Sequence, residues 1–278
     1  MPARLLLLAL GFMLTCRAGL ASAADPADDP DANPQWRQVR AALFGLRPIA
    51  VADPDVLTLD APYRAEDAAI VPVALRSRIA QSPTHYVKTA WLVIDGNPSP
   101  VAATFRFTPD SGRADVETRV RVEQYTFVRA IAELDDGSLH MATRFVKAAG
   151  GCSAPAGKDP AAAAANLGRM RLKVDDAGEP RRAQLLVSHP NTSGLAMDQI
   201  TRLYPTARYV RQVTVRYRDR PVLEADVDFS ISENPSFRFL FRGEGGGNSG
   251  GELAVEVVDT DGRTFESRIP VARRRDGA

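Results

Sequence analysis

The chain has 278 residues, and its 35 lysines and arginines nearly balance its 34 aspartates and glutamates, which gives a formal net charge of +1. This balance gives no electrostatic reason to expect binding to nucleic acid or to an anionic membrane. The three histidines, His85, His140 and His189, are far apart and show no metal-ligand spacing. The sequence therefore predicts no metal and no cofactor.

Residues 1–23 have the pattern of a secretory signal peptide. Arg4 supplies the positive start, residues 5–14 form an apolar run of roughly ten residues, and cleavage is expected after Ala23. That run is too short to span a membrane. Cys16 lies in the leader, and a lipid anchor on it is disfavoured because Thr15 precedes it. We expect a periplasmic protein of about 255 residues, a length that suits two domains.

The mature chain begins with an acidic, proline-rich segment, residues 24–33, which we expect to be a disordered N-terminal segment. One short amphipathic helix should follow from Pro34, with Gly45 as its stop. The residues at helical spacing in this helix are Trp36, Val39, Leu43 and Phe44.

The rest of residues 34–147 is a series of short β-prone runs separated by turn residues. The expected strands are 70–75, 87–94, 102–107, 117–122, 127–134 and 140–146. Several of these runs alternate between apolar and polar residues, which is typical of antiparallel sheets with one buried face. This part of the chain is predicted to be a β-sandwich preceded by a helix.

Short β-prone runs separated by turn residues occur again in residues 169–272, which we predict to be a second β-sandwich. Its expected strands are 169–174, 183–188, 209–217, 222–231, 237–241, 253–258 and 264–271. A basic tail, 273–278, ends the chain. The predicted fold class is all-β, with two Ig-like β-sandwich domains in tandem and a short N-terminal helix.

A Gly/Ala-rich linker, residues 148–168, joins the two predicted domains and carries Cys152 directly after Gly150 and Gly151. Its first part is too poor in apolar residues to fix itself by burial, so we expect the thiol to be exposed on a mobile arm. Its second part, 160–168, has the pattern of a two-turn helix that starts at proline and stops at glycine.

Cys152 is the only cysteine left once the leader is removed, so it cannot form an internal disulfide. It must be idle, intermolecular or chemically active. An ordinary exposed thiol has a pKa of about 8.5 and is only slightly ionised at neutral pH. The sequence alone shows no activated thiol.

Several segments of the first half carry a family pattern, namely 61–62, 65–73, 94–100, 118–121 and 150–152. Through them the first half resembles the SoxY subunit of the periplasmic sulfur-oxidation carrier. In the second half the corresponding segments are 188–190, 193–195, residue 198, 205–209 and 231–239. Through these the second half is similar to the SoxZ subunit of the same carrier. The arrangement resembles a fused SoxYZ-like carrier of the branch associated with quinoprotein (pyrroloquinoline quinone) alcohol dehydrogenases and their cytochromes.

The resemblance implies that the two halves pair within the molecule and that Cys152 is the swinging-arm cysteine to which sulfur intermediates are attached. It also implies that a haem cytochrome joins thiosulfate to this thiol and that a metal-dependent hydrolase later releases sulfate. The carrier itself would catalyse nothing. The chain departs from the stand-alone subunit because residues continue after Cys152, so the arm is held at both ends.

Two hypotheses follow for function. In the first, the protein is a non-enzymatic periplasmic carrier that holds a sulfur-containing or other thiol-reactive group on Cys152 and presents it to a c-type cytochrome and to sulfur-oxidising or quinoprotein dehydrogenase enzymes. In the second, it is an accessory module of a quinoprotein alcohol dehydrogenase and its cytochrome, and Cys152 is dispensable. An enzyme is disfavoured because no catalytic residues stand at a recognisable spacing. For His189, followed by Pro190, a structural role at a bend is favoured.

Overall fold

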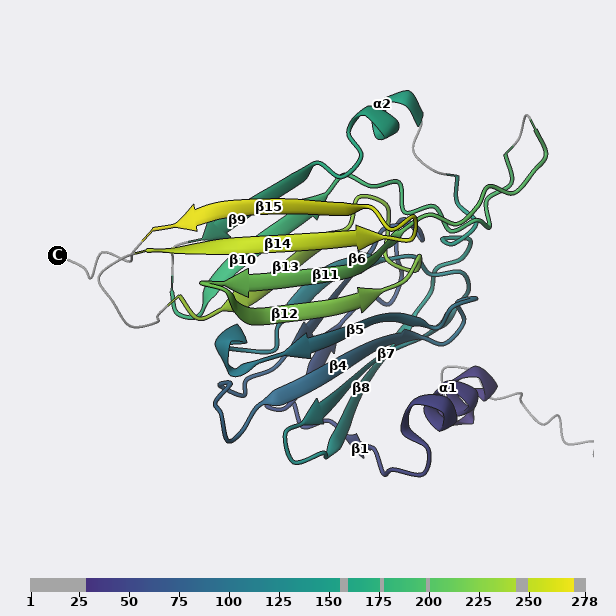
Figure 1. The fold of residues 1–278 in the computed structure, drawn as a ribbon. Coiled ribbons are helices and arrows are strands. Elements are labelled where there is room, and N and C mark those ends of the chain that lie inside the picture. Colours follow the sequence, from purple (N-terminus) through teal and green to yellow (C-terminus); the bar gives the residue numbers. More distant parts are fainter. Residues whose placement is uncertain (1–28, 156–159, 176–177, 199–200, 244–249, 273–278) are drawn as a thin grey trace, which may run out of the picture.

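The computed structural model describes residues 29–155, 160–175, 178–198, 201–243 and 250–272. Two β-sheets pack face to face, and the helix α1 (Pro34–Phe44) lies against the outside of one of them (Figure 1). The predicted all-β fold with a short N-terminal helix is confirmed. Within these residues, no helix is long and apolar enough to cross a membrane.

The first half contributes eight strands. They are β1 (Ala50–Val51), β2 (Thr58–Asp60), β3 (Val71–Arg76), β4 (Val87–Ile94), β5 (Val101–Phe107), β6 (Val116–Val120), β7 (Thr126–Leu134) and β8 (Leu139–Val146). The six longer strands match the predicted runs to within two residues at each end. β1 and β2 were not predicted, because two or three residues are too few to show an alternating pattern.

The second half contributes seven strands. They are β9 (Met170–Asp175), β10 (Arg181–Val187), β11 (Val210–Tyr217), β12 (Arg220–Val227), β13 (Ser236–Phe241), β14 (Gly251–Asp259) and β15 (Thr264–Val271). All seven were predicted, although β12 ends four residues before the expected Ile231. A short helix, α2 (Pro160–Ala165), precedes β9, as its sequence indicates.

The two halves share both of their sheets. The nine-stranded sheet has the order β1-β8-β7-β4-β5-β12-β11-β14-β15, and the six-stranded sheet has the order β2-β3-β6-β13-β10-β9. β5 pairs antiparallel with β12 in one sheet, and β6 pairs antiparallel with β13 in the other. The two predicted sandwiches are therefore joined edge to edge, which covers two strand edges in each half that would otherwise be open.

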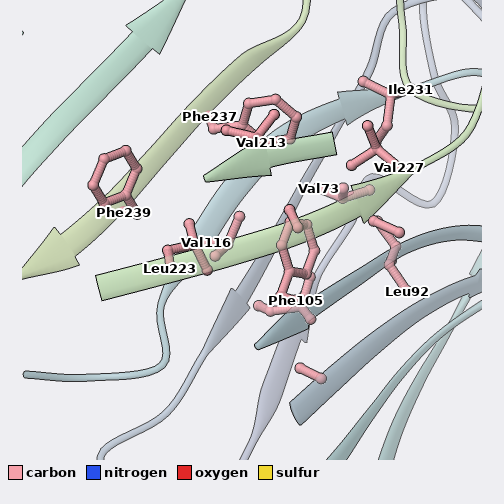
Figure 2. Packing of buried hydrophobic residues seen from close by; sticks show 14 of the residues in the cluster. Val73, Leu92, Phe105, Val116, Val213, Leu223, Val227, Ile231, Phe237 and Phe239 are labelled. Atoms are coloured by element: carbon pink, nitrogen blue, oxygen red, sulfur yellow. The ribbon is translucent and has the colours of Figure 1, made fainter. Parts of the chain in front are cut away.

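Because both sheets cross the junction, the apolar core is continuous between the halves. Figure 2 shows Val73, Leu92 and Phe105 of the first half in one cluster with Leu223 and Phe237 of the second. The rings of Phe105 and Phe237 are both buried, and their centroids are 6.4 Å apart in an edge-to-face arrangement. Such aromatic pairs stabilise a core beyond their buried area.

The helix α1 is held in place by its N-terminal cap and by the buried side chains of Trp36 and Phe44. The side chain of Asn33 accepts hydrogen bonds from two backbone N–H groups of the first turn, and Trp36 is 1% exposed. The guanidinium of Arg129 lies 4.4 Å from the Trp36 ring and pairs with buried Asp95. Of the segment 24–33, which we expected to be disordered, residues 24–28 lie outside the described residues. Pro30–Ala32 form a 3-10 helix, and the carbonyl of Pro30 accepts a hydrogen bond from Arg129.

Shared sheets predict that the two halves unfold together. Phe105→Ala should lower the free energy of unfolding by about 3–5 kcal/mol, because it opens a cavity in the common core. Leu46→Ala should change it by less than about 0.5 kcal/mol, because Leu46 is 97% exposed.

The measurement is urea unfolding followed by two probes. Tryptophan fluorescence reports only on the first half, which holds both tryptophans, Trp36 and Trp91, whereas far-UV circular dichroism reports on both halves. The two transitions should coincide in the wild type and in both variants. Separate midpoints for the two probes would contradict the shared core.

Candidate functional site

The candidate site is the segment that follows β8 and ends in Cys152. The N–H groups of Gly150 and Gly151 donate to the carbonyls of Glu123 and Val122, at 2.8 and 3.0 Å. A Cβ on Gly151 would lie 2.1 Å from the carbonyl oxygen of Ala68, so only glycine fits there. Gly151 is thus required by close packing, in a segment that we expected to be a mobile arm.

The carboxylate of Glu123 holds the segment from the side of the first half. One of its oxygens accepts hydrogen bonds from the N–H groups of Cys152 (2.8 Å) and Ser153 (3.2 Å). The other oxygen accepts from the Ser153 hydroxyl at 3.1 Å. Hydrogen bonds to an ionised acceptor are stronger than neutral ones, so Glu123 acts as a latch on the segment.

The second half holds the same segment from the other side. The hydroxyl of Ser193 donates to the carbonyl of Cys152 at 2.5 Å and accepts from the N–H of Leu195. Cys152 therefore lies at the junction of the two halves, between a carboxylate from one and a hydroxyl from the other. We call residues 150–153, held in this way, the latched segment.

The thiol of Cys152 is buried, which corrects our expectation that it is exposed on a mobile arm. Cys152 is 0% exposed and is free of any disulfide. Residues 148–158 are small and include few large apolar side chains, so their sequence indicates no partners. The partners are backbone groups and the side chains of Glu123 and Ser193, which come from distant parts of the chain and give no local signal.

Burial also raises the pKa of the Cys152 thiol, from 9.0 to about 12. Desolvation is the largest cause, the negative charge of Glu123 adds to it, and the guanidinium of Arg121 opposes both. A rise of this size lowers the thiolate fraction at neutral pH about a thousandfold. The latched thiol is thus protonated and unreactive, because the thiolate is the nucleophile.

Arg121 and Asn97 tie the two halves together beside the latched segment. Nη1 of Arg121 donates to the carbonyls of Phe229 and Ile231, both at 2.9 Å. Nδ2 of Asn97 donates to the carbonyl of Arg121 and to the Ser230 hydroxyl, and its Oδ1 accepts from the N–H of Glu123 at 2.9 Å. Asn97, which the sequence indicates only as a turn residue, therefore positions the latch.

His189 is buried and lies away from the thiol contacts. Its Nδ1 accepts from the N–H of Asn191 at 3.0 Å, and its Nε2 lies 3.7 Å from the carboxylate of Asp259. Burial lowers the pKa of His189, although Asp259 opposes the shift. These contacts within the second half agree with a structural role for His189. Throughout the described ranges, no three His, Cys, Asp or Glu side chains gather as a metal site.

Sequence reasoning identified Cys152, Gly150 and Gly151 but not the residues that hold them. Glu123 stands at the end of an alternating run, where a charged residue is ordinary. Ser193 is one of several serines in a turn-rich stretch. Neither carries a sequence signal for contact with Cys152. Glu123 is 29 residues away along the chain, and Ser193 lies in the other half, which meets the first through pairings such as that of β6 with β13.

Taken together, the fold and this junction define a class of protein: two β-sandwich domains fused through shared sheets, with one buried cysteine between them. Residues 40–152 match the family of the sulfur oxidation protein SoxY, and residues 170–270 match the family of the sulphur oxidation protein SoxZ. The chain therefore carries a SoxY domain and a SoxZ domain in tandem, and it is a fused SoxYZ-like protein. The pairing of the two domains within one molecule, predicted from the sequence, is confirmed.

Comparison with solved structures gives partial likenesses. The sulfur carrier protein SoxY from Chlorobium limicola f thiosulfatophilum is 26% identical, with a TM-score of 0.34, over 41% of this chain and 94% of that one. A superoxide reductase (neelaredoxin) from Ignicoccus hospitalis is 16% identical, with a TM-score of 0.31, over 33% of this chain and 79% of that one. No curated protein matches the chain.

The latch predicts how fast Cys152 reacts with an external thiol reagent. Glu123→Ala removes an acceptor of three hydrogen bonds, so labelling of the native protein by DTNB at pH 8 should become about 10- to 100-fold faster. Glu66→Ala removes the same charge from an exposed neighbouring loop and should leave the rate unchanged. Equal rates in the wild type and Glu123→Ala would contradict the latch.

The raised pKa predicts a loss of stability at high pH. The pKa of Cys152 is higher in the folded protein than in the unfolded chain, so its contribution is complete below pH 9 and is lost as the pH rises toward 12. At pH 10 the loss should be about 1.4 kcal/mol. Urea unfolding of the wild type and Cys152→Ser at pH 7 and pH 10 measures this term. A serine variant that loses as much stability as the wild type would contradict it.

Proposed function

We propose that this protein is a non-enzymatic carrier of sulfur oxidation that holds a sulfur intermediate covalently on Cys152 and presents it to partner redox enzymes. The observation that carries the proposal is the position of this cysteine. The SoxY match ends at residue 152, and the buried thiol is held there by residues of both the SoxY and the SoxZ domain.

The proposed loading step is a thiol oxidation. The Cys152 sulfur forms a bond to the outer sulfur of thiosulfate, the thiol loses its proton, and two electrons pass to an oxidant, which we propose is a c-type cytochrome. The attacking or oxidised species is the thiolate. The latched thiol, with a pKa of about 12, cannot supply it at neutral pH, so loading requires that the segment leave the junction first.

The geometry supports such a release without loss of the fold. The latched segment is bound through hydrogen bonds to Glu123, Val122 and Ser193, and it contributes no strand to either sheet. Local openings of this kind cost less than global unfolding. We propose a closed form, in which the thiol is protected, and an open form, in which it meets its partners.

We further propose that the protein acts in the periplasm. Support comes from the predicted signal peptide, residues 1–23, which lies outside the described residues, and from the family matches. The association with a quinoprotein alcohol dehydrogenase is part of the same proposal and rests on the sequence resemblance alone. The domain boundaries, with a linker at 148–168, stay a prediction.

Tetrathionate tests the carrier site without an enzyme partner. A Cys152 thiolate should displace thiosulfate from tetrathionate and keep an S-thiosulfonate group, which intact-mass spectrometry would detect as one adduct per mature chain. Peptide mapping should place it on Cys152, dithiothreitol should remove it, and Cys152→Ser should show none.

The urea-unfolded wild type is the control for the tetrathionate experiment. It exposes the thiol fully and should form the adduct quickly. If the unfolded chain forms the adduct and the native protein does not, even after hours, the native fold does not release the thiol and the carrier proposal fails.

The burial of Cys152 favours one second candidate. In that case the protein is an accessory module for a quinoprotein dehydrogenase and its cytochrome, and the cysteine is a packed core residue. Cys152→Ser separates the two candidates in cells that depend on this protein. A carrier should lose all activity with the serine variant, whereas an accessory module should keep it.

A further inference from the structure

A groove of about 820 Å³ lies on the outer face of the six-stranded sheet. Its floor follows a row of residues that stand opposite one another in register across four strands: Ala74 on β3, Glu117 on β6, Arg238 on β13 and Gln184 on β10. Two of these strands belong to each half of the chain. The groove therefore exists only because the SoxY and SoxZ domains share this sheet.

The groove carries more positive than negative charge. Four arginines line it, Arg76, Arg119, Arg144 and Arg238, against the carboxylates of Asp60 and Glu117. Glu117 pairs with both Arg76 (3.0 Å) and Arg238 (3.2 Å), and Asp60 pairs with Arg76. Both carboxylates are thus already engaged with arginines inside the groove.

Two arginines of the groove lack an acidic partner. Arg119 donates through Nη2 to the carbonyl of Asn234 at 2.9 Å, but its Nε is buried and has no hydrogen-bond partner. Arg144 is exposed and donates only to the carbonyl of Thr143. Among the described residues, neither forms an ion pair with a carboxylate. A buried donor without a partner costs free energy, so the Arg119 side chain would gain by a shift that lets its guanidinium share a carboxylate bound in the groove.

We propose that this groove is a docking site for an extended acidic segment of a partner protein. Its excess arginines favour carboxylate side chains, which an arginine fork can bind in a bidentate way. The apolar parts of its lining, among them Pro72 and Leu186, suit the backbone and small side chains between those carboxylates. A single small oxyanion would leave most of the groove unfilled.

The position of the groove relates it to the latched segment. Arg119 lies on β6, and the chain continues from it through Arg121 to Glu123, which holds Cys152. A partner segment bound in the groove would therefore cross the strand that leads to the latch. The docking site does not depend on thiol chemistry, so it can be tested whether or not Cys152 is a carrier site.

The experiment uses the full mature chain and a fluorescein-labelled decapeptide of alternating glutamate and alanine. Fluorescence anisotropy should show saturable binding that weakens as salt is raised. The double variant Arg119→Gln with Arg144→Gln should bind the peptide about tenfold more weakly. The matched control, Arg211→Gln with Arg216→Gln, makes the same change in net charge on exposed residues of β11 and should bind like the wild type.

Two further variants show whether a loss of peptide binding comes from the groove. Arg144→Gln alone removes an exposed side chain and should weaken binding even if the double variant does not fold, which circular dichroism would reveal. Cys152→Ser should bind like the wild type, which separates docking from the carrier role. The proposal is overturned if both double variants lose affinity equally, if no peptide binds, or if millimolar sulfate displaces the peptide as well as unlabelled peptide does.

Discussion

The pairing of β5 with β12 and of β6 with β13 is the constraint on which the rest of the structure depends. It turns two sandwiches into one continuous pair of sheets, and it brings two distant loops to the same place. One loop carries Glu123 from the SoxY domain, and the other carries Ser193 from the SoxZ domain. Both loops bind the backbone of Cys152, Glu123 at its N–H group and Ser193 at its carbonyl. A SoxY-type domain alone would lack the hydrogen bond from Ser193.

Under the proposed carrier function, the latched segment would reconcile two opposed requirements. A thiol that is always exposed and ionised would be open to oxidation, whereas a thiol that is always buried could not be loaded. Burial and the charge of Glu123 keep the Cys152 thiol protonated in the closed form. Because hydrogen bonds and not sheet pairing hold the segment, it can open while the sandwich stays intact. Protection of the thiol is thus separate from stability of the fold in the proposed mechanism.

The sequence predicts the fold well because the longer strands carry their own signal. β4 and β15 match the predicted runs 87–94 and 264–271 at both ends, since alternation and turn residues mark them locally. The site is predicted only in part. Cys152 could be identified because it is the sole cysteine outside the predicted leader, but its burial could not, since the side chains that bind its backbone come from distant parts of the chain. The same holds for Arg119 and Arg144, which are ordinary surface residues in the sequence and line one groove only after the strands β6 and β8 have folded.

The most direct test of this account is the urea dependence of Cys152 labelling, measured beside global unfolding. The account predicts that a thiol reagent labels Cys152 through a local opening whose free energy depends only weakly on urea, because little surface is exposed when residues 150–153 leave the junction. Labelling should therefore proceed well below the midpoint of global unfolding. The account is contradicted if the free energy of opening falls with urea as steeply as the free energy of unfolding and equals it, since Cys152 would then react only in the unfolded chain.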